Sequence, residues 1–174
     1  LNAGRVDKFE ELFFRAIERV FSTYGCLDDP KKLSSEAIDC IPKNIIITKN
    51  GIEMFDVEYQ PDISLTKSHY LFRCALGFSK QHVRQGHWPY NSPNELYLIF
   101  CRHFDILPDI QTDIESEITF RRTILPDGSA GLNYKEIHDG FFNKTCILKK
   151  IQRYFTHRIS LAIHNGKFNR FLNR

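Results

Sequence analysis

The chain has 174 residues, of which 42% are hydrophobic and 26% are charged, and its formal net charge is +3. This composition is too apolar for a disordered chain and is long enough for one domain with a sizeable core. Five cysteines, an odd number without a Cys-x-x-Cys pair, argue against a disulfide framework or a zinc ribbon and favour a reducing cytoplasm. No apolar run reaches the roughly 20 residues of a membrane span, and the N-terminal residues lack the apolar core of a secretion signal. We therefore expect a protein that is soluble or lies on a membrane surface.

Helical periodicity runs through most of the chain. Apolar residues three and four positions apart predict amphipathic helices separated by polar connections. The third of these helices has the clearest start, because Ser92-Pro93-Asn94-Glu95 combines an N-cap serine with a proline at the first helical position. The predicted helices cover 6–24, 64–86, 93–104, 108–124 and 133–164.

Two short strands are expected on either side of Asn50-Gly51. Ile45-Ile46-Ile47 precedes this pair, and Ile-Glu-Met-Phe follows it. Asn-Gly between such runs is a strong hairpin signal because both turn positions take positive φ. The sequence therefore predicts an α+β fold that is mostly α, with one β-hairpin embedded among helices.

Three polar side chains flank this hairpin at informative spacings. Asp39 and Asn44 stand five apart, and Asp56 follows Asn44 by twelve. A hairpin brings the residue before its first strand and the residues after its second strand to the same end. Phosphoryl transfer needs a carboxylate near the attacking hydroxyl and oxygen ligands for magnesium. Singly, each of these residues is more commonly a turn or cap residue, but together around a hairpin they favour a functional geometry.

The segment 36–59, which contains DCIPKNIIITKNGIEMFDVE, resembles a known family. It is similar to the kinase-like region that follows methyltransferase domains in bacterial O-antigen and capsule assembly proteins, where lDxxPxNli…fDxEW segments recur. The resemblance implies a protein-kinase-like C-lobe that uses Mg²⁺ and ATP. It also implies a glycan or lipid-linked saccharide as the acceptor, in surface polysaccharide assembly.

The resemblance also implies roles for individual residues. Asp39 would be the acidic residue of the catalytic loop, Asn44 and Asp56 the metal ligands, and Glu58 the second acidic residue of the D-x-E signature. Lys43 lies inside the loop, where a cation can stabilise the charge of the transferring group. Two simpler interpretations stay open: a structural ion pair for Glu58 and a solvated loop lysine for Lys43.

The chain departs from the family pattern in three ways: Ala37 stands at the position of the customary loop histidine, Val57 replaces the glycine after Asp56, and, most seriously, the N-terminal lobe is missing. The sequence has no G-x-G-x-x-G segment and no strand with an ATP-pairing lysine. We therefore expect residues 1–140 to be a C-lobe whose N-terminal lobe lies outside this chain, and the isolated chain to be inactive. The alternative is a non-catalytic interaction or membrane-docking module of a polysaccharide methyltransferase.

Residues 141–174 form a separate electrostatic segment. After Asp139 there are eight basic residues and no acidic ones, which leaves 16 basic against 21 acidic residues in the rest of the chain. Three interpretations compete: a helix packed on the domain with a basic solvated face, an interfacial membrane helix, and a nucleic-acid-binding segment. Nucleic acid is disfavoured because no recognised motif is present. We expect a cytoplasmic protein, peripheral at the inner membrane if the segment binds anionic lipid through Lys149, Lys150, Arg153, Arg158, Lys167 and Arg170.

Overall fold

The computed structural model describes residues 6–48, 51–54, 64–82, 90, 92–124 and 134–142. Helices dominate this part of the chain and small antiparallel pairs of strands complete it, so the fold is α+β and mostly α. The chain divides into two compact units, residues 1–142 and 143–174. The second unit lies outside the described residues, and so do most of the predicted helix over 133–164 and the basic segment.

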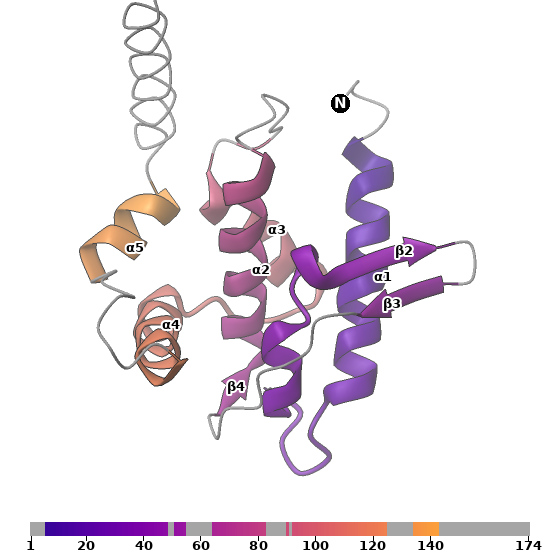
Figure 1. The fold of residues 1–174 in the computed structure, drawn as a ribbon, viewed down its shortest axis with the longest axis horizontal. Coiled ribbons are helices and arrows are strands. Elements are labelled where there is room, and N and C mark those ends of the chain that lie inside the picture. The colour runs from indigo at the N-terminus through magenta and orange to yellow at the C-terminus, as the bar shows by residue number, and fades with distance from the viewer. Residues whose placement is uncertain are drawn as a thin grey trace, which may run out of the picture. The chain divides into compact units, whose positions relative to one another are not determined.

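The elements of the described residues are shown in Figure 1. In chain order they are α1 (Val6–Tyr24), β1 (Lys32–Leu33), the 3-10 helices η2 (Ser35–Asp39) and η3 (Pro42–Asn44), β2 (Ile45–Thr48), β3 (Gly51–Met54), β4 (Leu65–Thr66), α2 (Lys67–His82), α3 (Pro93–His103), α4 (Ile110–Ile124) and α5 (Tyr134–Phe142). β1 pairs with β4 and β2 pairs with β3, both antiparallel.

Helix α1 confirms the predicted helix over 6–24. Phe13, Ile17 and Val20 recur on one face and are buried, as an amphipathic helix requires. The helix ends before Gly25, where an added Cβ would meet the carbonyl oxygen of Phe21 at 2.7 Å. This close approach explains why the chain leaves the helix at a glycine.

Helices α3 and α4 also confirm their predictions, and each begins at a side-chain cap. The Ser92 hydroxyl accepts a hydrogen bond from the backbone N–H of Glu95 at 3.3 Å, which is the expected N-cap contact. A carboxylate oxygen of Asp109 accepts the backbone N–H of Thr112 at 3.2 Å at the start of α4. These starts are therefore set by local sequence.

Helix α2 begins later than the sequence pattern suggests. Leu65 and Thr66 form β4, which pairs with β1. β1 has only two residues and lies in the polar connection that follows the first predicted helix. The Thr66 hydroxyl accepts the backbone N–H of His69 at 3.0 Å and so caps α2. The first residues of the expected helix therefore form a strand, because they pair with a segment that is distant in the sequence. The predicted end of this helix, at residue 86, lies outside the described residues.

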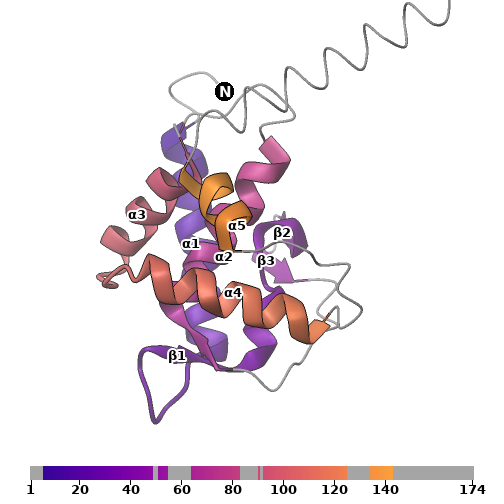
Figure 2. The ribbon, with the colours of Figure 1, turned by 90° about the vertical axis from the view of Figure 1, so that its left-hand side faces the viewer.

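Helix α2 is the centre of the described core. It packs against α3 and α4, and α5 in turn packs against α3 and α4, as Figure 2 shows from the side. On the other side, the ring of Tyr70 meets the ring of Phe21 from α1 at 5.9 Å between centroids. Because α2 is enclosed in this way, its residues 70–75 have almost no exposure except for Arg73, at 8%.

The hairpin is present, but its turn is one residue earlier than predicted. Ile45 pairs with Met54 and Thr48 pairs with Gly51, so the two-residue connection is 49–50, which lies outside the described residues. Gly51 has φ of +134°, a conformation open to glycine and strained for other residues. The glycine of the Asn-Gly pair therefore begins the second strand and does not occupy the centre of the turn.

Candidate functional site

The candidate site is built on the loop 39–44, which joins η2 to the hairpin. Backbone hydrogen bonds close its two 3-10 turns: the N–H of Cys40 donates to the carbonyl of Ala37 at 3.1 Å, and the N–H of Asn44 to that of Ile41 at 2.8 Å. Pro42 stands at the first position of η3, where its fixed φ suits the turn and its missing N–H costs no hydrogen bond. The loop is therefore a compact structure of two consecutive turns.

Asn44 and Asp39 meet within this loop. The side-chain Nδ2 of Asn44 donates to the backbone carbonyl oxygen of Asp39 at 2.9 Å, so the five-residue spacing closes a ring. Both residues are buried, with 3% exposure for Asn44 and 7% for Asp39, whereas Ile38 and Cys40 on either side of Asp39 have none. Asp39 thus lies at the edge of the core. A cation at this place would be bound through Oδ1, the oxygen of the same amide group.

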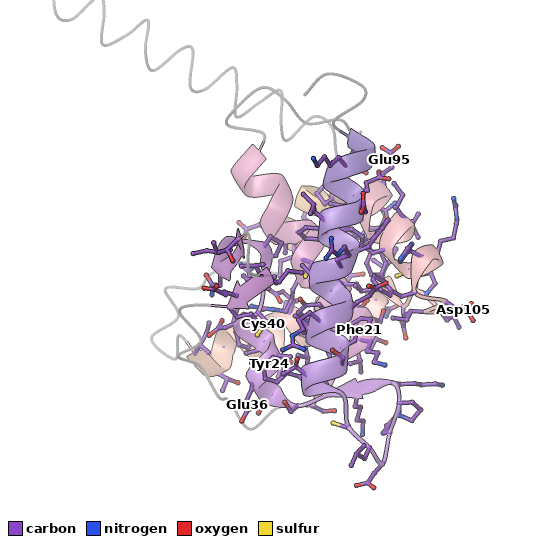
Figure 3. The ribbon with its side chains drawn as sticks, turned by 90° about the vertical axis from the view of Figure 1, so that its right-hand side faces the viewer. Phe21, Tyr24, Glu36, Cys40, Glu95 and Asp105 are labelled. Atoms are coloured by element: carbon purple, nitrogen blue, oxygen red, sulfur yellow. The ribbon has the colours of Figure 1, made fainter. Side chains whose placement is uncertain are left out.

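Cys40 fixes the loop against two helices. The hydroxyl of Tyr70 in α2 donates to the Cys40 carbonyl at 2.6 Å, and both residues have no exposure. The Cys40 thiol donates to the backbone carbonyl of Glu36 at 3.8 Å, and Figure 3 shows its side chain near that of Tyr24 from α1. Burial raises the pKa of this thiol, and the neighbouring Tyr24 hydroxyl only partly offsets that rise. Cys40 is therefore a neutral packing residue at neutral pH.

The pairing of β2 with β3 determines which part of the chain lies at the same end of the hairpin as the loop 39–44. Because Ile45 pairs with Met54, the loop that ends at Asn44 and the chain that leaves Met54 are at the same end of the hairpin. Asp56 is two positions beyond Met54 in the sequence. The register therefore places Ile45, next to Asn44, and Met54 at the same end of the hairpin.

The structure brings together two of the predicted site residues, Asp39 and Asn44. The backbone of Lys43 belongs to η3, but its side chain is not among those described, and Asp56 and Glu58 lie outside the described residues. The predicted lipid-binding residues of the basic segment lie outside them as well. Their roles stay predictions. Within the described ranges, no three His, Cys, Asp or Glu side chains are grouped as a metal site.

A buried charge network between α2 and α4 was not predicted from the sequence. The Glu117 carboxylate accepts hydrogen bonds from Arg73 Nη1 at 2.6 Å and Arg121 Nε at 2.7 Å, and lies 3.3 Å from His69 Nε2. Burial alone would raise the pKa of Glu117, but these neighbours lower it well below its usual range. The guanidinium of Arg73 also lies 4.0 Å from the centroid of the Phe120 ring.

A second buried network lies beside the first. The hydroxyls of Ser68 and Tyr97 each donate to Asp113 Oδ2 at 2.7 Å. Burial raises the pKa of Asp113 above its ordinary value, and these hydrogen bonds only partly offset that effect. One feature of the sequence could have indicated these networks. Asp113 and Glu117 are spaced so that they share a helical face with the apolar Ile114 and Phe120, which is the buried face of α4.

The comparisons with known proteins do not assign a family or a function, so any functional proposal rests on the geometry described above. No family model, no curated protein and no solved structure matches the chain. Among the described residues, no helix combines the length and the apolar character that crossing a bilayer requires.

Proposed function

We propose that this chain is the C-terminal part of a kinase-like phosphotransferase that uses ATP and Mg²⁺. The observation that carries the proposal is the side-chain bond from Asn44 to the Asp39 carbonyl at the end of the hairpin that leads to Asp56. This bond ties the Asn44 side chain to the backbone of Asp39, so the two residues belong to one closed loop. The nucleotide would be covered by a lobe outside these 174 residues.

The donor set fits magnesium. A carboxylate and an amide offer hard oxygen ligands, which Mg²⁺ prefers over nitrogen or sulfur. Asn44 and Asp56 are the proposed ligands, with Glu58 near them in sequence. When bound, Mg²⁺ neutralises charge on the nucleotide phosphates. Lys43, within the loop, is proposed to add positive charge where the transferred group develops negative charge.

Asp39 is the proposed general base. It accepts the proton of an acceptor hydroxyl as that oxygen forms its bond to the γ-phosphorus of ATP, and the bond to the β,γ-bridging oxygen breaks to release ADP. The acceptor class is a saccharide or lipid-linked glycan in surface polysaccharide assembly. This class is supported by the resemblance of the segment 36–59. The basic segment supports a peripheral location at a cytoplasmic, anionic membrane surface.

The test is the Asp39→Asn substitution in the complete gene product. ADP formation from Mg·ATP would be measured with and without purified O-antigen polysaccharide as the acceptor probe, and the fold would be checked by circular dichroism. Loss of a general base predicts a fall in turnover of about 10² or more. Asp28→Asn is the matched control, because Asp28 is an exposed carboxylate in the connection after α1.

Two outcomes separate the alternatives. A folded Asp39→Asn protein that loses turnover while Asp28→Asn retains it supports the phosphotransferase. If Asp39→Asn turns over Mg·ATP at the unsubstituted rate, or if the unsubstituted protein has no turnover at all, the catalytic interpretation is wrong. The non-catalytic interaction or membrane-docking module is then the better account.

A further inference from the structure

The loop 39–44 is held at two adjacent backbone carbonyls. Asn44 donates to the carbonyl of Asp39, and Tyr70 donates to the carbonyl of Cys40, the next residue. The first bond lies within the loop and would move with it. The second bond ties the loop to α2, so it fixes where the loop stands relative to the core.

Tyr70 is itself held in place from both sides. On α2, its neighbour His69 and Arg73, one turn later, contact Glu117 of α4. Its ring meets the ring of Phe21 in α1 edge to face, with an interplanar angle of 62°. Tyr70 has no solvent exposure. Its hydroxyl is therefore a fixed donor, positioned by the helices and not by the loop.

We propose that Tyr70 is a positioning residue for Asp39, acting through the Cys40 carbonyl. Without the hydroxyl, a buried carbonyl loses its donor from α2, and the turns that carry Asp39 and Asn44 open more readily. The catalytic consequence rests on the proposed function. A loosened Asp39 would lie in productive geometry for a smaller fraction of the time, so kcat would fall while nucleotide binding changed little.

Tyr70→Phe and Tyr97→Phe form a matched pair. Each removes one buried tyrosine hydroxyl from the same core, and that of Tyr97 in α3 donates to Asp113 and not to the loop. The first readout is hydrogen exchange at the amides of Cys40 and Asn44, measured on the 174-residue chain. We expect about tenfold faster exchange at both amides in Tyr70→Phe and less than about a twofold change in Tyr97→Phe.

The second readout is Mg·ATP turnover by the complete gene product, for which we expect a roughly tenfold lower kcat and little change in KM in Tyr70→Phe alone.

Equal exchange at the loop amides in both variants would overturn the positioning role. If Asp39→Asn abolishes turnover but Tyr70→Phe keeps its kcat, the catalytic consequence is wrong while the proposed function stands. If Asp39→Asn has no effect, the proposed function fails, and the exchange rates still decide whether Tyr70 holds the loop. Should Tyr70→Phe fail to fold, the Tyr70 hydroxyl proton of the unsubstituted chain decides: slow exchange by NMR supports the bond, and rapid exchange refutes it.

Discussion

Replacing Glu117 with glutamine should destabilise the domain strongly. The Glu117 side chain is only 4% exposed and accepts short hydrogen bonds from Arg73 and Arg121. The substitution keeps an acceptor oxygen but removes the negative charge, which leaves the Arg73 guanidinium, 8% exposed, without its buried counter-charge. Breaking a buried pair from one side typically costs 3–5 kcal/mol. Because the amide can still accept from Arg73, we expect the lower end of this range, about 3 kcal/mol.

Urea unfolding followed by far-UV circular dichroism measures this loss on the whole chain. With a denaturant slope of about 2 kcal/mol per molar, the midpoint should fall by roughly 1.5 M. Glu115→Gln is the matched control, because Glu115 lies on the same helix but is exposed. Its free energy of unfolding should change by less than about 0.5 kcal/mol. Equal midpoints for the two variants would refute the argument that the Glu117 charge is required in the core.

Three further predictions concern pH, the hairpin and the basic segment. Because folding lowers the pKa of Glu117, its carboxylate contributes fully to the free energy of unfolding only above its ordinary pKa of 4.5, and this contribution is lost as the pH falls further. The difference in stability between the unsubstituted protein and Glu117→Gln should therefore narrow between about pH 5 and 2. Gly51→Ala should destabilise by about 1–3 kcal/mol because of its φ of +134°. Gly77→Ala, in helix α2 with open space for a Cβ, should be neutral or slightly stabilising in the same urea unfolding assay. In vesicle co-sedimentation, the intact chain should pellet with anionic lipid and release with salt, while a chain ending at Phe142 should stay in solution; equal pelleting of both would remove the membrane interpretation.

The features that sequence predicted well are those set by neighbouring residues. The apolar stripe of α1 and the Ser92 cap of α3 depend on residues within one or two helical turns, so their pattern is visible without tertiary structure. The late start of α2 was missed because it depends on pairing with β1, more than 30 residues earlier in the chain. A two-residue strand is too short to leave a periodic signal.

The same distinction applies to the candidate site. Asp39 and Asn44 are five positions apart, so the bond between them is local and the sequence could indicate that they share one loop. Tyr70 could not be identified in this way, because its contact with Cys40 spans 30 positions and depends on the packing of α2. The Arg73–Glu117 pair spans 44 positions, and its charged residues look like solvent-facing ones in sequence. Long-range polar contacts were therefore the part that sequence pattern could not supply.

The central claim is that the loop end of the hairpin binds a divalent cation between Asn44 and Asp56, with Asp39 beside it. Titration of the 174-residue chain with Mn²⁺, read as paramagnetic broadening of amide signals by NMR, tests this claim directly. We predict selective broadening at residues 39–44 that Mg²⁺ reverses and that Asp56→Asn abolishes. Broadening that survives in Asp56→Asn, or that is no stronger at the loop than around the exposed Asp28, would contradict the claim.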